Sequence, residues 1–297
     1  MFESPIPDLR RFVVDMASDI DEISILIDDL DKGWPPRQVE SHDISTIKHL
    51  IKSLNKIQRE LKRAETSCSH LVFVRSDIYE KLVDETSDRG KYNVIKVDWS
   101  DPEQLKHMLR QRVFANLPER LGEEAWNALA PSTNSESSID KLIDASLRRP
   151  RFLIDICERM IAFAVNRGHT FVTEDDVNAA LKQMSLYLVS DFAYEMRDVA
   201  GTPKDIFYRF IGKPEKLSME DILSILSGME IDLPNDEIIS LLLWYGFLGV
   251  AIEGRRPIFI YDVAYDIRRL EGEQNPTASQ RVYAVNPAFL RGLEKAA

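Results

Sequence analysis

The feature that most constrains the fold is a pair of short apolar runs separated by one long amphipathic pattern. Ile23–Ile27 (ISILI) and His70–Val74 (HLVFV) have the length and composition of buried β-strands. Between them, Asp43–Glu65 carries apolar residues at steps of three and four, which predicts an amphipathic helix. A strand, a long helix and a strand form a right-handed βαβ unit, so we expect a parallel sheet. Because both runs are almost entirely apolar, we expect both faces of that sheet to be buried.

Acidic residues stand directly after the first predicted strand. In Ile25–Asp31 (ILIDDLD), Asp28 and Asp29 follow the last apolar residue. Ligands of open α/β sheets bind at the carboxyl ends of the strands. An aspartate placed there can hold the water shell of Mg²⁺ beside a nucleotide phosphate, and a second acid can orient or deprotonate the attacking water. Helix capping is the alternative explanation, although a cap needs only one oxygen.

The string Ile25–Trp34 (ILIDDLDKGW) resembles the Walker B segment of KAP-like and related bacterial STAND/AAA+ ATPases, in which four apolar residues precede Asp-Asp-Leu-Asp. The resemblance implies ATP and Mg²⁺ as cofactors. It also implies that Asp28 binds the metal and that Asp29 is the catalytic acid. For Asp31, the third acid, we expect only a solvated position at the start of a helix.

Two further segments are similar to nucleotide-contacting elements of the same families. Leu71–Asp77 (LVFVRSD) resembles a sensor-1 strand, which implies that Arg75 and Ser76 contact the γ-phosphate or the attacking water. A salt bridge from Arg75 to nearby acids is the alternative. Arg148–Arg151 (RRPR) resembles a sensor-2 turn and implies a phosphate contact for Arg151. Three arginines at a helix start oppose the helix dipole, which favours an outside anion; a surface patch that binds a neighbouring carboxylate is the alternative.

The remaining sequence divides the chain into three predicted regions. The first includes a third predicted strand at Val94–Val97, and the second reads as helices only. The third gives three helices and then a hairpin of Phe247–Ile252 and Pro257–Tyr261, which is the winged-helix order. The expected fold class is therefore a partial α/β parallel-sheet P-loop core, a helical AAA+-like lid and a C-terminal winged-helix domain, mostly helical overall. The three regions are residues 1–113, 114–200 and 201–297.

A phosphate-binding loop is missing from this pattern. A P-loop needs Gly-x-x-x-x-Gly-Lys-Ser/Thr, and none of the 12 glycines fits it. Without that loop no backbone nest cradles the β-phosphate. We therefore expect a Walker A segment or a partner subunit from outside this sequence, and no ATP hydrolysis by the chain alone. The leading hypothesis is a nucleotide-dependent switch, for which the resemblance implies bacterial signalling or defence; a homo-oligomer is compatible with it.

Composition bears on the choice of partner. The formal net charge is −11, whereas nucleic-acid binders usually carry a basic face. The helix predicted at Asp236–Tyr245 is apolar and acidic, unlike helices that read bases. A DNA-associated Orc-like AAA+ protein, contacting duplex DNA through Arg255 and Arg256, is therefore the second hypothesis, and a degenerate non-catalytic scaffold is the third. The absence of an apolar run of membrane-spanning length and the two cysteines without metal-ligand spacing favour a cytoplasmic protein with no membrane partner.

Overall fold

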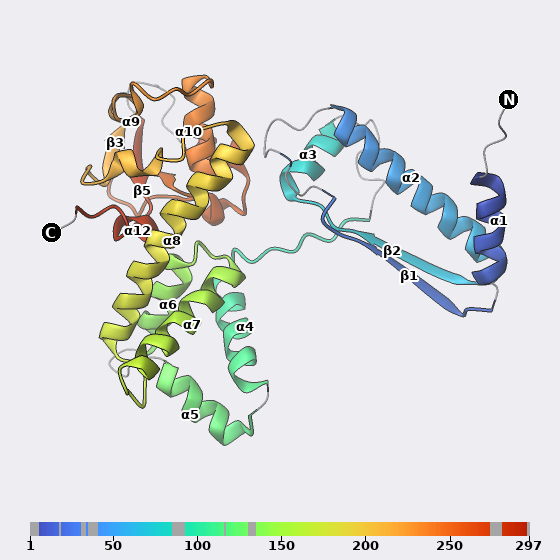
Figure 1. The fold of residues 1–297 in the computed structure, drawn as a ribbon, viewed down its shortest axis with the longest axis horizontal. Coiled ribbons are helices and arrows are strands. Elements are labelled where there is room, and N and C mark those ends of the chain that lie inside the picture. The colour runs from blue at the N-terminus through green and yellow to red at the C-terminus, as the bar shows by residue number, and fades with distance from the viewer. Residues whose placement is uncertain are drawn as a thin grey trace. The chain divides into compact units, whose positions relative to one another are not determined.

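The computed structural model describes residues 6–17, 19–30, 34, 41–84, 93–115, 117–129, 135–273 and 281–295. The chain forms two compact units, which are Met1–Val94 (unit 1) and Ile95–Ala297 (unit 2) (Figure 1). This division lies before the boundary that the sequence pattern predicted near residue 113. Among the described residues, no helix is long and apolar enough to cross a bilayer.

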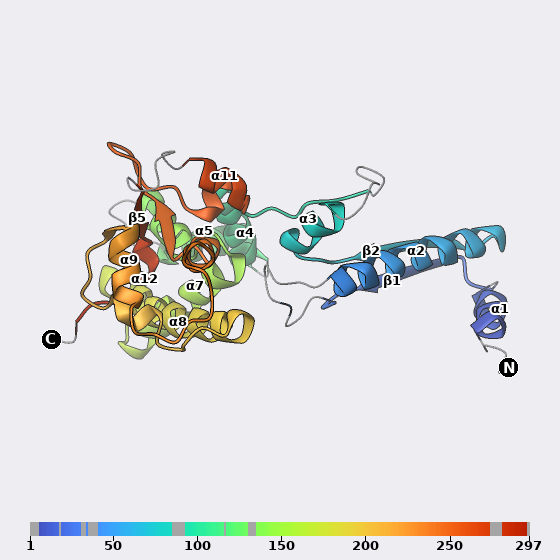
Figure 2. The same cartoon turned by 90° about the horizontal axis from the view of Figure 1, so that it is seen from above.

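Unit 1 is built around the predicted βαβ arrangement. Its two strands pair in parallel, from Glu22 opposite Ser67 to Ile27 opposite Val72. The long helix α2 runs along one side of the pair (Figure 2). Near its carboxyl end, Leu61 is buried beside Cys68 of the second strand. The elements are α1 (Ile6–Ala17), β1 (Glu22–Ile27), α2 (Ser41–Arg63), β2 (Ser67–Val72) and α3 (Ser76–Asp84).

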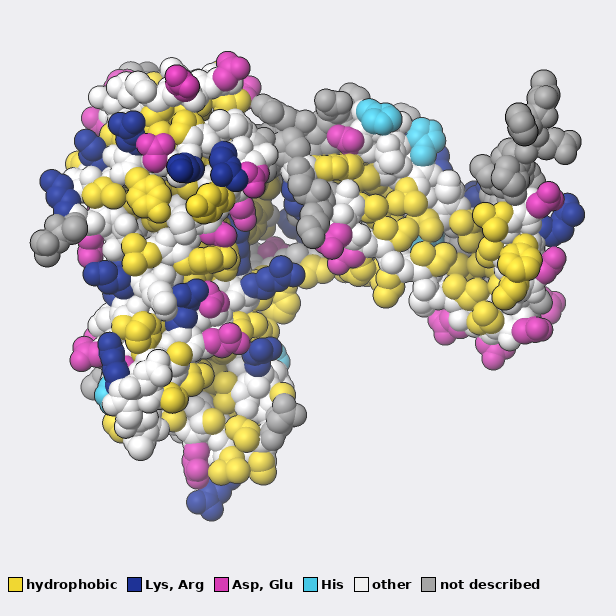
Figure 3. Space-filling view, viewed as in Figure 1, with side chains coloured by type: hydrophobic (Ala, Val, Ile, Leu, Met, Phe, Trp, Pro, Cys, Tyr) yellow, Lys and Arg dark blue, Asp and Glu magenta, His cyan; other side chains and the backbone are white. Residues whose placement is uncertain are grey.

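The prediction that both faces of this sheet are buried is wrong. Exposed and half-buried residues alternate along β1, as in a sheet covered on one side. The open side carries Leu26, Leu71 and Phe73, which are 65%, 50% and 47% exposed. Figure 3 shows hydrophobic side chains gathered on the surface of this unit. Among the described residues, no layer covers the second face.

The prediction of a third strand at Val94–Val97 is also wrong. The segment is extended but pairs with no strand among the residues that the structure describes. Val94, Ile95 and Val97 are largely exposed. A strand forms only where a neighbouring edge completes its hydrogen bonds, so a β-prone sequence alone does not produce one.

The first part of unit 2 is helical, as predicted. Pro150 starts α7, where the missing N–H costs no helical hydrogen bond, and Gly168 follows the helix with a φ of +75°. The helices share one core with the rest of unit 2, in which Met160, Leu188 and Phe192 are fully buried. The helices are α4 (Pro102–Phe114), α5 (Glu119–Leu129), α6 (Ser135–Ala145), α7 (Pro150–Asn166) and α8 (Glu174–Ala200).

The second part of unit 2 surrounds a small antiparallel sheet with the strand order β3-β5-β4. The prediction that Pro257–Tyr261 forms a hairpin strand with β4 is mostly wrong. It meets β4 in a single bridge between Val250 and Ile258. The Asp262 carboxylate then accepts the Phe259 N–H at 3.0 Å and starts a 3-10 turn, which ends the extended segment. The elements are η1 (Phe207–Phe210), β3 (Lys216–Ser218), α9 (Met219–Leu226), α10 (Asn235–Trp244), β4 (Leu248–Val250), η2 (Ile260–Val263), α11 (Ile267–Gly272), β5 (Val282–Val285) and α12 (Pro287–Leu290).

The start of α8 contains a capping box. The Asp176 backbone N–H donates to the Thr173 hydroxyl oxygen, and the Thr173 backbone N–H donates to the Asp176 carboxylate. Arg167 Nη1 and His169 Nδ1 also contact that carboxylate, each at 2.7 Å. Burial of the carboxyl raises its pKa, but the hydrogen bonds from Thr173, His169 and Arg167 outweigh burial and lower the pKa of Asp176 well below its usual range.

Replacing Asp176 with asparagine should lower the Tm of unit 2 by about 3–8 °C at pH 7, since the ion pair with Arg167 is lost and the hydrogen bonds from His169 and Thr173 no longer end on a charged acceptor. A depressed folded-state pKa contributes stability that is complete above the unfolded pKa of about 3.9 and declines progressively as the pH falls from there toward the folded-state pKa. The Tm difference between wild type and variant should therefore stay constant from pH 7 to about pH 5 and begin to narrow toward pH 3. Asp175→Asn, in the same turn but exposed, is the control; equal Tm values for both variants would contradict the role of Asp176.

Candidate functional site

The parallel pairing of β1 and β2 brings predicted site residues to one edge of the sheet. The ladder continues to the point where both strands end, because the Phe73 N–H donates to the Ile27 carbonyl at 2.9 Å. Asp28 and Asp29 leave β1 at this edge, and Arg75 and Ser76 leave β2 there. Neighbouring parallel strands present their carboxyl ends together. Four of the five predicted site residues therefore share one edge of unit 1.

The two acids form a local turn of their own. Asp29 adopts the left-handed conformation, with φ +59°, which aspartate tolerates better than most residues. Its N–H donates to Asp28 Oδ1 at 2.8 Å. Both carboxylates are exposed. This turn keeps the oxygens of Asp28 and Asp29 accessible at the end of the strand, where a cation could reach them.

Arg75 makes a contact that the sequence pattern did not predict. Its Nη1 donates to the Trp34 carbonyl at 2.9 Å. The bond ties the segment after β2 to the connection between β1 and α2. Arg75 is thus partly committed to holding the edge in shape. Ser76 starts α3 and is exposed.

Arg151, the fifth predicted site residue, belongs to unit 2. It lies in the first turn of α7, and its side chain is exposed. The neighbouring Arg149 lies over the Phe152 and Phe192 rings, at 5.4 and 4.9 Å from their centroids. Arg148 is buried and pairs with Asp262 at 2.9 Å. The outside-anion interpretation is therefore wrong for Arg148, whose anion comes from the same unit.

The donor set at the unit 1 edge suits magnesium but not a complete nucleotide. Carboxylate oxygens are preferred Mg²⁺ ligands, and the ion commonly takes one or two of them together with waters and substrate phosphates. Within the described ranges, no group of three or more His, Cys, Asp and Glu residues could hold a metal by itself. An ion held by Asp28 and Asp29 would need further ligands, such as waters or substrate phosphates. The glycine-rich loop that cradles such a phosphate is not part of this sequence.

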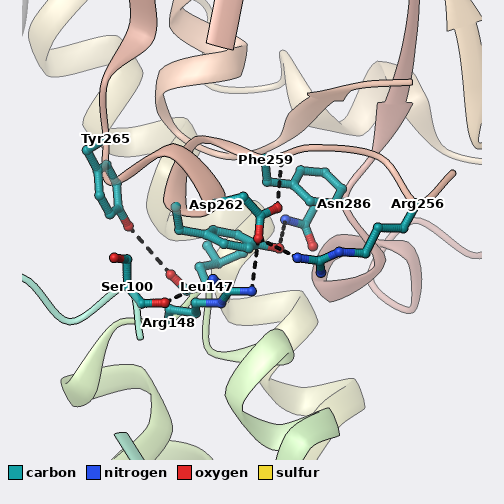
Figure 4. Close-up of polar contacts among 9 residues, drawn as sticks. Ser100, Leu147, Arg148, Arg256, Phe259, Asp262, Tyr265 and Asn286 are labelled. Atoms are coloured by element: carbon teal, nitrogen blue, oxygen red, sulfur yellow. Dashed lines mark hydrogen bonds and ion pairs between the residues drawn. The ribbon is translucent and has the colours of Figure 1, made fainter. Parts of the chain in front are cut away.

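Sequence reasoning missed a second polar cluster, inside unit 2. Arg148, Arg256 and Asp262 meet there, and Asn286 Nδ2 donates to the Tyr261 hydroxyl at 3.2 Å (Figure 4). Burial raises the pKa of Tyr261 well above its usual range. Arg148 and Asn286 are far in the sequence from Arg256, Tyr261 and Asp262, so no local pattern predicts the cluster.

Comparison with known families finds one match. A family model described as a FunZ-associated C-terminal helical domain matches residues 103–193. The match runs from the first turn of α4 into α8 and so covers the helical part of unit 2. A search of curated proteins finds no match.

Proposed function

Residues 103–193 of this protein are similar to a FunZ-associated C-terminal helical domain, and we propose that the protein is the C-terminal part of a P-loop ATPase of the AAA+/STAND type. It would act as a nucleotide-dependent switch that needs a Walker A segment or partner subunit from outside these 297 residues. The observation that carries the proposal is the parallel β1–β2 pair, with acids at its carboxyl edge and an apolar side left open.

The open side supports an incomplete core. Parallel sheets have both faces covered, and a pair of strands alone is marginally stable in water. Leu26, Leu71 and Phe73 lie on a sheet face that larger parallel sheets bury in the core, yet here they are exposed. Further strands and a covering helix would bury them, and a P-loop strand with its helix is such an addition.

The proposed roles follow the geometry of the edge. Asp28 would bind Mg²⁺ through its exposed carboxylate, and Asp29 would orient or deprotonate the attacking water. Ser76 and Arg75 would contact the γ-phosphate from the neighbouring strand end. For Arg151, at the start of α7 in unit 2, the proposal keeps only a forked guanidinium contact with phosphate oxygens.

The C-terminal part of unit 2 supports a winged-helix module that contacts protein. Its order of β3, α9, α10 and β4, with β5 pairing between β3 and β4, is compatible with that class, although η2 and α11 lie between β4 and β5. All residues from Ile238 to Leu243 of α10 are buried, so this helix has little surface for base edges. Arg256 pairs with Asp262. The Orc-like DNA-binding function remains the second candidate, and Arg255→Ala is the cleaner test of it by salt-dependent DNA shift.

Nucleotide binding tests the proposal directly. Calorimetry should detect no micromolar ATP binding by the chain alone. A fusion that places a strand, a Gly-x-x-x-x-Gly-Lys-Ser loop and a helix before Met1 should bind Mg-ATP with a Kd about tenfold or more tighter. Micromolar binding by the unfused chain would contradict the requirement for an outside P-loop. If the fusion folds but does not bind ATP, a non-catalytic scaffold is favoured.

A further inference from the structure

A buried ion pair joins the two parts of unit 2. Arg148, in the turn between α6 and α7, lies 2.9 Å from Asp262 of η2, and these side chains are only 9% and 10% exposed. Arg148 Nη1 also donates to the Ser100 carbonyl at 2.9 Å, and its guanidinium lies over the Tyr261 ring. Arg256 contacts the same Asp262 oxygen at 2.7 Å. Figure 4 shows these side chains converging from separate elements.

Two unfavourable backbone turns face each other across this pair. Leu147 and Arg148 have φ values of +53° and +52°, and Ala264 and Tyr265 have +53° and +61°. Residues with a Cβ rarely adopt this region, so surrounding contacts must hold them there. The two turns touch, since the Tyr265 hydroxyl donates to the Leu147 carbonyl at 3.5 Å.

The segment carrying Asp262 also covers α10. We name residues 258–273 the cover segment. Ser240 Oγ donates to Glu271 Oε1 at 2.9 Å, and the Trp244 ring meets the Tyr265 ring edge-on at 6.2 Å. Part of the burial of α10 therefore depends on the position of the cover segment.

We propose that the Arg148–Asp262 pair is a latch that holds the cover segment closed over α10. The left-handed backbone of Ala264 and Tyr265 disfavours the closed position of the cover segment, and the buried pair opposes its release. Breaking the pair lets the cover segment leave α10 as one piece while the helical core stays folded. The latch itself is independent of nucleotide. A nucleotide could act on the latch only under the proposed function. In that case Arg151, three residues after Arg148, contacts a phosphate.

Hydrogen exchange of the full chain, followed by mass spectrometry, tests the latch. Arg148→Met removes the charge and retains most of the apolar stem. Exchange in the cover segment and α10 should rise about tenfold or more, while residues 177–196 of α8 keep their protection. Arg256→Met leaves the Arg148 contact in place and should give a smaller rise in the same peptides. Arg149→Met is the control, because the Arg149 guanidinium lies over the Phe152 and Phe192 rings.

Two results would overturn the latch. The first is a uniform rise that includes α8, which would mean that the ion pair only stabilises the whole unit. The second is unchanged exchange of the cover segment in both the Arg148 and Arg256 variants. If Arg148→Met does not fold, the Arg256→Met result alone decides, since that residue is exposed.

Discussion

Truncation of Phe247 to alanine should lower the free energy of unfolding of unit 2 by about 3–5 kcal/mol, through lost apolar burial and the cavity left behind. Phe247 is 0% exposed. Its ring centroid lies 4.6 Å from that of Phe207, 4.9 Å from that of Phe210 and 5.1 Å from that of Phe289. The partner rings come from η1 and α12, and Phe247 directly precedes β4, so this side chain packs where three elements meet.

Urea unfolding of the full chain, followed by the near-UV signal of the aromatic residues, measures this loss as a shift of the midpoint at constant m-value. Tyr208→Ala is the matched control, because Tyr208 lies in the same 3-10 turn as Phe207 and is 44% exposed. It should change stability by about 0.5 kcal/mol or less. Equal losses for the two variants would show that Phe247 does not organise this core.

Local patterns predicted the elements that depend on local chemistry. The strand–helix–strand order of unit 1 followed from the periodicity of Asp43–Glu65 and its flanking apolar runs, and the structure has it. Thr173 and Ser218 form capping boxes because each is followed three residues later by an aspartate. Side chain and backbone lie within one turn in each case, so the sequence contains the whole interaction.

Interactions between distant segments were not predictable in this way. Val94–Val97 has a strand sequence, but whether it pairs depends on an edge that another segment must provide. Arg148 and Asp262 are 114 positions apart in the sequence, and their contact depends on how α6, α7 and η2 pack. In the candidate site, too, local positions were predictable and contacts between distant residues were not. The position of Asp28 and Asp29 after β1 could be read from the chain, whereas the bond from Arg75 to Trp34 could not.

Replacing Asp29 with asparagine should reduce ATP hydrolysis by the P-loop fusion about 100-fold or more in kcat, the range associated with a positioned general base. The amide has the size of the carboxylate but cannot take a proton, so ATP binding should change little. Because the N–H of Asp29 bonds to Asp28 Oδ1, the turn should survive the substitution, and asparagine also tolerates the left-handed conformation. Loss of turnover with retained affinity would then report chemistry rather than folding.

The matched control is Glu22→Gln, at the amino end of the same strand, where the side chain is equally exposed. Glu22→Gln removes one negative charge at the amino end of β1, and Asp29→Asn removes one at the opposite end. The side chain at position 22 cannot reach a ligand bound at the carboxyl edge. Turnover with Glu22→Gln should match the unsubstituted fusion. Asp28→Asn should instead weaken the dependence of ATP binding on Mg²⁺, because this acid is assigned to the metal. If Glu22→Gln and Asp29→Asn leave the same turnover, Asp28 and Asp29 are only surface charges. The carboxyl edge of the sheet is then not a nucleotide site.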